Sequence, residues 1–280
     1  MERFFIITNR VKDPDRSMQE QIRKYLEARG KTVDAAAADE RERIRSAEAD
    51  CFLVLGGDGT MLQAARDTAE KETPLLGINL GKVGYLAEVE RTNWQDALDQ
   101  LLAGDCEIEE RMMLTGSIRG VGHRENSQRP NYALNDVAIT RSGALQIIPY
   151  NVYVNDQFLN LFQADGMIIS TPTGSTGYNL SAGGPIVEPS AQLLLLTPIC
   201  PHTLNTRSIV LAPQDRIAIE IGTSREGRKF TAEADFDGCE NPQIMHSGDR
   251  IEIERSERRT RIVKLSRRSF LETLHGKMSS

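Results

Sequence analysis

The sequence contains little cysteine, and no two cysteines stand at a metal-binding spacing. The four cysteines occupy positions 51, 106, 200 and 239, far apart and without a CxxC pair. This pattern indicates neither a disulfide framework nor a zinc site. Cys51 lies inside an apolar run, so we expect it to be a core residue. The cysteines therefore indicate no metal site.

Long apolar runs and an excess of basic charge are also missing. No segment approaches the ~20 apolar residues of a membrane-spanning helix, and the first seven residues do not form a signal peptide. The net charge is −6, from 34 basic and 40 acidic residues. An acidic balance argues against a general role on nucleic acids or membrane surfaces, which require a basic face. We therefore expect a cytoplasmic protein without nucleic-acid or membrane partners.

The two halves of the chain differ in their hydrophobic rhythm. Up to about residue 103, short apolar strands alternate with helical patterns, which predicts a parallel sheet with helices on both faces. The predicted strands of this half are 4–8, 32–36, 51–55 and 74–79, and the predicted helices are 17–28, 60–69 and 93–102.

After about residue 105, alternation with period two predicts a largely antiparallel β domain. Its clearest predicted strands are 152–154, 209–211, 216–221 and 250–254, with a polar exposed loop at 117–130. Residues 270–277 are predicted to form a closing helix. The predicted organisation is an α/β domain at 1–104, a β-rich domain at 105–266, and a segment at 267–280 that packs back on the first domain.

The most informative motif is Gly56-Gly57-Asp58-Gly59-Thr60, directly behind the apolar run 51–55. This arrangement predicts a strand, a glycine turn and a helix start, where free N–H groups favour phosphate. A carboxylate at such a place repels phosphate, so the presence of Asp58 in this turn needs a functional explanation. It could hold a metal ion, or accept a proton from a hydroxyl that attacks phosphorus. The alternative interpretation is an ordinary tight turn.

A second glycine-rich block covers residues 165–185, where an apolar strand runs into small hydroxyl residues and glycines. Small side chains leave room for a flat ligand, and Tyr178 can stack on a base. The alternative is a surface loop rich in serine, threonine and glycine. A third feature is Asn135-Asp136, which interrupts a strand-like pattern. This pair either grips the hydroxyls of a sugar or forms a turn at the strand edge.

Taken in order, these motifs resemble those of the NAD kinase family. The match consists of the turn at 56–60, Gly77–Leu86, Asn135-Asp136, Thr171–Tyr178 and Pro201–Leu204, and it covers most of the chain. The first motif is shared with lipid kinases and the phosphofructokinase turn, whereas the Thr171–Thr176 block is more particular to NAD kinases. The resemblance implies a Rossmann-like, phosphofructokinase-like sheet and a β-sandwich.

The resemblance also implies an activity: transfer of a phosphoryl group from ATP to the 2′-hydroxyl of the adenosine ribose of NAD. It implies Mg²⁺ or another divalent metal, and a homodimer or homotetramer. Asp58 matches the general base on the hydroxyl, and Asp165 matches a site carboxylate reached across a subunit interface. The other NAD-binding positions it implies are Gly59, Asn135, Asp136, Thr173, Thr176, Gly177, Tyr178, Asn179, Leu180 and Ser181. Gly56, Gly57, Gly59 and Thr60 form the expected phosphate cradle.

Several positions depart from the family pattern. Asp136 replaces the usual Glu, Gly177 the usual Ala, Gln163 a frequent Arg, and Cys239 a frequent Gln, while His is found near Gln146 in other members. His202 is either a second acid–base group or a hydrogen-bonding residue at a subunit contact.

The hypothesis is that NAD extends across both domains, with its adenine at 173–181 and its diphosphate near the turn at 56–60. Two alternatives stay open, namely a lipid kinase with the same turn and a catalytically dead dinucleotide sensor.

Overall fold

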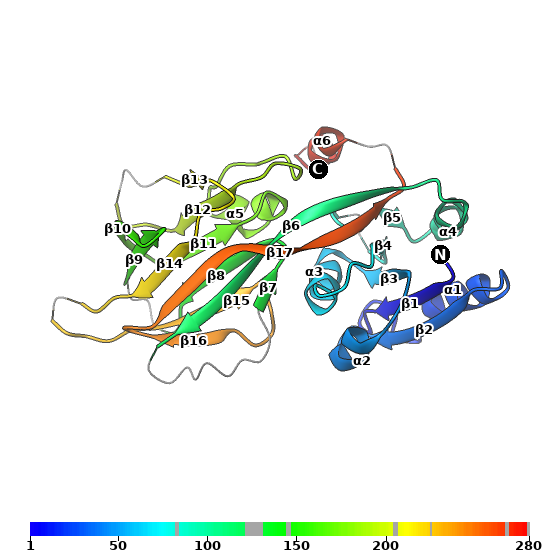
Figure 1. The fold of residues 1–280 in the computed structure, drawn as a ribbon, viewed down its shortest axis with the longest axis horizontal. Coiled ribbons are helices and arrows are strands. Elements are labelled where there is room, and N and C mark those ends of the chain that lie inside the picture. The colour runs from blue at the N-terminus through cyan, green and yellow to red at the C-terminus, as the bar shows by residue number, and fades with distance from the viewer. Residues whose placement is uncertain are drawn as a thin grey trace. The chain divides into compact units, whose positions relative to one another are not determined.

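The computed structural model describes residues 1–81, 84–120, 131–143, 147–203, 207–224, 226–266 and 269–278. These residues form two compact units, unit 1 with residues 1–111 and 259–280, and unit 2 with residues 112–258. The division falls inside two long strands, β6 (Glu107–Arg119) and β17 (Arg250–Lys264), which continue from one unit into the other (Figure 1). The domain limits expected from the sequence remain a prediction.

Unit 1 contains the predicted parallel sheet. Its strands β1 (Arg3–Thr8), β2 (Thr32–Ala37), β3 (Cys51–Gly56) and β4 (Leu75–Asn79) pair in the order β2-β1-β3-β4. The short β5 (Val89–Glu90) runs parallel to β4, and the end of β17 joins the same sheet where Ile262 pairs with Leu75. All residues of β3 and β4 are buried, which explains their continuous apolar runs.

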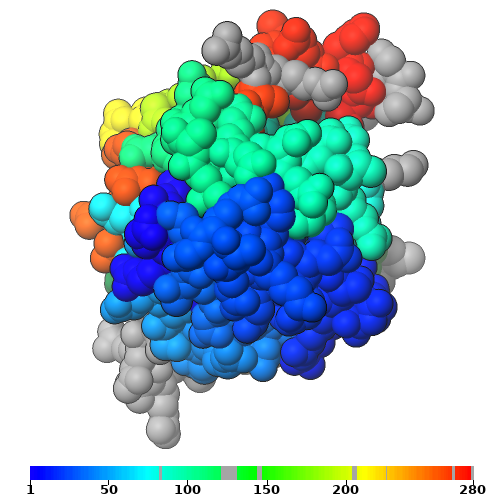
Figure 2. All heavy atoms as spheres, turned by 90° about the vertical axis from the view of Figure 1, so that its right-hand side faces the viewer, coloured from blue at the N-terminus to red at the C-terminus, as the bar shows by residue number. Residues whose placement is uncertain are grey.

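Unit 1 has five helices among its described residues. They are α1 (Ser17–Glu27), α2 (Arg41–Ser46), α3 (Asp58–Asp67), α4 (Trp94–Ala103) and α6 (Phe270–Met278). Helices α1 and α4 share one core with alternate residues of the strands, such as Ile6 and Leu53. The blue and teal residues of unit 1 lie on the face shown in Figure 2. Gly104, with a φ of 76°, ends α4 in the left-handed conformation that favours glycine.

Unit 2 consists of two antiparallel sheets, as predicted. One contains β9 (Ile148–Val154), β10 (Gln157–Ala164) and β14 (Ile217–Ile221) with the first part of β17, while β7 (Asn131–Ala133) pairs with β6. The other has the order β13-β12-β11-β8-β15-β16. Its strands are β8 (Asp136–Arg141), β11 (Gly166–Ser170), β12 (Leu194–Ile199), β13 (Ile209–Leu211), β15 (Thr231–Phe236) and β16 (Gln243–His246).

The inner faces of the two sheets form one core, in which Tyr150 and Ile219 from the first pack with Ile139 and Ile169 from the second. This is a β-sandwich. The predicted loop at 117–130 is wrong at its start, because β6 continues to Arg119, and residues 121–130 lie outside the described part. Within the described residues, no helix is both long and apolar enough to cross a membrane.

Candidate active site

The glycine turn lies where the sequence predicts, between β3 and α3. Gly57 precedes the helix in an extended conformation, and Asp58 is the first helical residue. Gly56 lets the Thr60 side chain lie close to the backbone, because a Cβ atom on Gly56 would overlap that side chain. Asn9, just after β1, donates a hydrogen bond from Nδ2 to Thr60 Oγ1 at 3.1 Å. The carboxyl ends of β1 and β3 are thereby joined at the turn, the edge at which parallel sheets bind ligands.

The Asp58 carboxylate is held by three consecutive backbone N–H groups of the loop after β4. Tyr85 donates to Oδ2 at 2.7 Å, while Leu86 and Ala87 donate to Oδ1 at 3.0 and 3.2 Å. A carboxylate offers about four acceptor positions, so one position on Oδ2 has no donor among the described residues. These bonds fix the orientation of the carboxylate, and they also explain how a carboxylate is accommodated at a phosphate-binding turn.

Gly84 makes this approach of the loop possible. A Cβ atom on Gly84 would overlap the Asp58 carboxylate. We expect Gly84→Ala to displace the carboxylate and lower kcat by about 10²-fold, the usual result of a misplacement near 1 Å. Steady-state kinetics with the substrates that the sequence motifs predict measures this. Gly276→Ala in α6 is the control, because a Cβ atom there would meet no other atom within 4 Å. Equal rates for Gly84→Ala and the control would contradict the role of the loop.

In unit 2, Asn135 and Asp136 lie at the bend between β7 and β8, anchored by a distant carboxylate. Asp237 accepts backbone N–H bonds from Leu134, Asn135 and Asp136 at 2.8, 2.7 and 3.0 Å. Asp237 itself has a φ of 59°. The sequence analysis did not predict this anchor, since its partners are about a hundred residues away. Its only local signal is the Asp237-Gly238 dipeptide, which favours a turn.

Asp136 is buried, with an exposed fraction of 6%. Burial, and then the neighbouring carboxylates of Asp237 and Asp235, raise the pKa of Asp136 to about 8. The Oδ1 atom of Asn135 is buried and has no hydrogen-bond partner among the described residues. An unsatisfied buried acceptor is costly, so this pair is suited to a ligand that brings hydroxyl or amine donors.

The second glycine block lies against this pair within unit 2. It forms a short 3₁₀ turn, Thr173–Thr176, and the short helix α5 (Tyr178–Ser181). A Cβ atom on Gly177 would lie 3.2 Å from Asn135 Nδ2 and 3.7 Å from Asp136 Oδ2. The structure therefore brings together Asn135, Asp136 and Gly177.

Most hydroxyls of this block do not face a free space. Thr171 Oγ1 donates to the carbonyl of Leu134 at 2.6 Å, and Ser175 Oγ donates to the carbonyl of Val187 at 3.1 Å. The amide of Asn179 is used in the same way, donating to Ser175 and Pro185 and accepting from Thr197. These side chains stabilise the block, whereas Tyr178, Leu180 and Ser181 in α5 are exposed.

Asp165 forms an ion pair with Arg141, Nε to Oδ1, at 3.2 Å. The pKa of Tyr178 is raised, first by partial burial and then by the nearby Cys200, Asp136 and Asp165. His202 is exposed, and its backbone N–H donates to the carbonyl of Gln163 at 2.9 Å. His123 and Gln146 lie outside the described residues.

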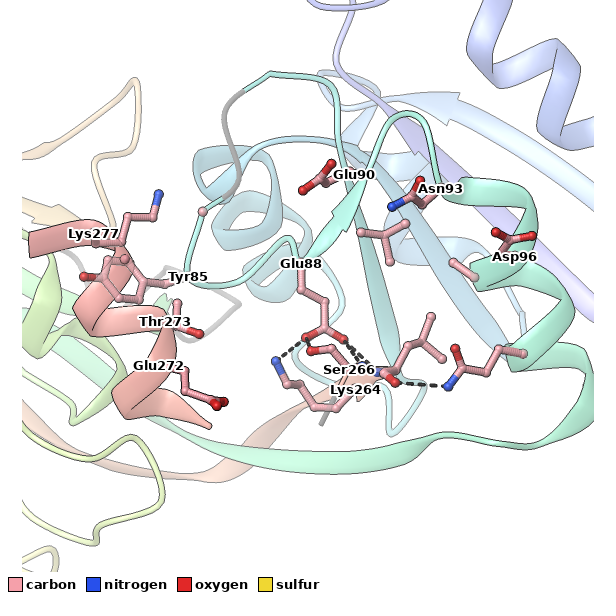
Figure 3. Close-up of a pocket in the computed structure, with 16 residues that line it drawn as sticks. Tyr85, Glu88, Glu90, Asn93, Asp96, Lys264, Ser266, Glu272, Thr273 and Lys277 are labelled. Carbon is pink, nitrogen blue, oxygen red and sulfur yellow. Dashed lines mark hydrogen bonds and ion pairs between the residues drawn. The ribbon is translucent and has the colours of Figure 1, made fainter. Parts of the chain in front are cut away.

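Unit 1 also contains a cavity of about 700 Å³ beside α4 and α6 (Figure 3). Glu88 stands at its centre, pairs with Lys264 and accepts a bond from the N–H of Leu265 at 2.7 Å. Its ionisable lining comprises four carboxylates and two ammonium groups, from Glu88, Glu90, Asp96, Glu272, Lys264 and Lys277. This negative lining disfavours a phosphate ligand, so the cavity is not the phosphate site.

Comparison with known proteins follows the same division of the chain. Residues 6–106 match the family model for the ATP-NAD kinase N-terminal domain, and residues 134–265 match the model for the ATP-NAD kinase C-terminal domain. A NAD kinase of Lachnospira eligens is 44% identical, with 99% of this chain and 100% of the relative covered. A NAD kinase of Agathobacter rectalis is also 44% identical, with 100% and 99% covered.

Solved structures show the same fold. A crystal structure of yeast NADH kinase with NADH has a TM-score of 0.85 at 21% identity, covering 100% of this chain and 88% of that one. A NAD kinase from Archaeoglobus fulgidus in complex with ATP has a TM-score of 0.77 at 24% identity, covering 99% and 98%. Fold and sequence together define a phosphotransferase with an α/β unit and a β-sandwich. The chain belongs to the ATP-NAD kinase family, as its motifs predict.

Proposed function

We propose that the protein transfers the γ-phosphoryl group of ATP to the 2′-hydroxyl of the adenosine ribose of NAD, producing NADP. Full-length relatives named NAD kinase support this activity. The observation that carries the chemistry is the Asp58 carboxylate, oriented at the start of α3 by three backbone N–H groups. Neither the lipid kinase nor the dead sensor is supported by the matched families.

In the proposed mechanism, Asp58 accepts the proton of the 2′-hydroxyl as the oxygen attacks phosphorus. A bond forms between this oxygen and the γ-phosphorus, the bond from the γ-phosphorus to the bridging oxygen breaks, and ADP leaves. A secondary alcohol is a poor nucleophile, and a positioned base contributes about 10²–10⁴-fold. The unused acceptor position on Asp58 Oδ2 is the one suited to this proton.

The other site residues are assigned by the same proposal. Gly56, Gly57, Gly59 and Thr60 hold phosphate oxygens through backbone N–H groups and the helix start. Asn135 and Asp136 bind the nucleoside, since a buried acceptor without a partner among the described residues lies there. The adenine-side pocket consists of Thr173, Thr176, Gly177, Tyr178, Asn179, Leu180 and Ser181. Asp165 completes the site from a neighbouring subunit.

A divalent metal such as Mg²⁺ fits this site if ATP carries it. Among the residues that the structure describes, no group of three or more His, Cys, Asp or Glu side chains could hold a metal ion. Mg²⁺ commonly binds through substrate phosphates and water, so the Gly56–Thr60 turn would hold it through the phosphates of ATP. When bound, Mg²⁺ neutralises charge on the donor's phosphates.

We further propose a homodimer or homotetramer in the cytoplasm. The edge strand β10 exposes Phe158, Leu159 and Leu161, with exposed fractions of 57%, 40% and 45%. An apolar stripe on a sheet edge is typical of a subunit contact.

The direct test is incubation of the purified protein with ATP, Mg²⁺ and NAD, followed by assay of NADP with an NADP-specific dehydrogenase. We expect NADP to form in proportion to ADP, and none without ATP. Parallel reactions replace NAD by a long-chain lipid alcohol. Lipid phosphorylation without NADP would support a lipid kinase, and tight NAD binding without turnover would support a sensor. Either result would overturn the proposal.

A further inference from the structure

Lys12 lies over the glycine turn, and the motif analysis did not point to it. A Cβ atom on Gly57 would lie 2.5 Å from Lys12 Nζ, and one on Gly81 would lie 3.7 Å from the same atom. The ammonium group thus stands against the backbone of the phosphate cradle, between the loops that follow β3 and β4. The absence of a side chain on Gly57 leaves the room that Lys12 occupies.

The loop that carries Lys12 is tied to the turn. Asn9 Oδ1 accepts the backbone N–H groups of Val11 and Lys12 at 3.0 and 3.2 Å, and Asn9 Nδ2 donates to Thr60 Oγ1. Asp13 then caps α1 by accepting N–H bonds from Met18 and Gln19 at 3.2 and 3.0 Å. One asparagine therefore links the backbone of Lys12 to the final residue of the Gly56–Thr60 motif.

The Lys12 ammonium has no carboxylate at ion-pair distance in the part of the chain that the structure describes. Its neighbour Arg10 differs, since it pairs with Asp39 at 3.3 Å and with Glu40 at 3.7 Å. Lys12 is also exposed, so solvent and ligands can reach it. An ammonium group over backbone N–H groups at a helix start forms an anion site with two sources of positive potential.

We propose that Lys12 binds a phosphate group of a nucleotide at the Gly56–Thr60 turn. This inference rests on the proposed function and adds a phosphate-binding residue to it. The charge is needed there because Asp58 brings a carboxylate into the same turn, and an unopposed carboxylate repels phosphate. The phosphate belongs either to ATP or to the diphosphate of NAD. The KM values for the two nucleotides distinguish these cases.

The test compares Lys12→Gln and Lys12→Arg with Lys24→Gln, a matched loss of one exposed ammonium on α1. We expect Lys12→Gln to lower kcat/KM by about 10–100-fold for the nucleotide that Lys12 contacts, the usual effect of losing a charge-assisted hydrogen bond. Lys12→Arg should recover part of the loss, and Lys24→Gln should behave as wild type. A change confined to the KM of ATP identifies the donor, and a change confined to the KM of NAD identifies the acceptor.

A binding measurement separates this inference from the proposed activity. Inorganic tripolyphosphate is titrated into wild type and each variant by calorimetry at low and high salt. We expect weaker binding and a smaller salt dependence in Lys12→Gln, even if no NADP is formed by the wild type. Unchanged KM values and unchanged tripolyphosphate binding in Lys12→Gln would overturn the inference, whatever the assay for NADP gives.

Discussion

Replacing Asp58 by asparagine is expected to lower kcat by about 10²–10⁴-fold, with the Kd for NAD almost unchanged. Asparagine keeps the size of the side chain and one acceptor oxygen, so two of the three loop bonds can persist. It cannot accept the proton of the ribose hydroxyl. Single-turnover formation of NADP measures the chemical step, and equilibrium titration measures binding.

The loop contact gives a second explanation for a slow variant, and Gly84→Ala separates the two. Gly84→Ala displaces the carboxylate but keeps it, so its rate should fall less than that of Asp58→Asn, which removes the proton acceptor. Near-normal turnover in Asp58→Asn, or a rate no lower than that of Gly84→Ala, would remove Asp58 from the role of base.

The second large effect concerns the stability of unit 2. Burial and the charges of Asp237 and Asp235 raise the pKa of Asp136 from an ordinary value of 3.8 to about 8. Between these pH values the folded protein holds a proton that the unfolded chain has released. The contribution of Asp136 to the free energy of unfolding is therefore fully present below pH 3.8 and is lost as the pH rises to about 8.

The expected slope is about 1.4 kcal/mol per pH unit within this window. Asp136→Asn does not titrate, so its stability relative to wild type should rise by roughly 3 kcal/mol between about pH 5.5 and 7.5. Chemical denaturation followed by circular dichroism measures the difference. Asp105→Asn, at an exposed site, is the control for removal of one carboxylate. If the free energies of unfolding of wild type and Asp136→Asn changed in parallel with pH, the proposed effect of burial on Asp136 would be contradicted.

The fold was predictable because its patterns are local. Alternation of apolar strands and helices predicted the parallel sheet of unit 1, and period two predicted the antiparallel β domain of unit 2. Helix α2 was missed because its six residues contain a single buried apolar side chain, Ile44, and so show no helical period. The full length of β17 was missed because its second half is rich in arginine, which conceals the alternation seen at 250–254.

The site was predictable only in its motifs. The turn at 56–60 and the pair Asn135-Asp136 carry signals in their own sequence. Their supports do not, because Tyr85 and Asp237 reach them across 27 and about a hundred residues, through contacts that only the fold creates. The sequence shows a glycine at position 84, but it does not show that this glycine makes room for the Asp58 carboxylate. In the sequence, Lys12 likewise resembles any exposed lysine, and only the structure brings it to the glycine turn.

The course of β17 has a consequence for synthesis on the ribosome. Unit 2 is inserted between residues 111 and 259 of unit 1, and the last strand of unit 1 follows it. Glu88 obtains its partner Lys264 only when this strand has emerged. Synthesis of the α/β unit begins first but ends last. Its sheet therefore lacks the end of β17 while the chain of unit 2 is being synthesised.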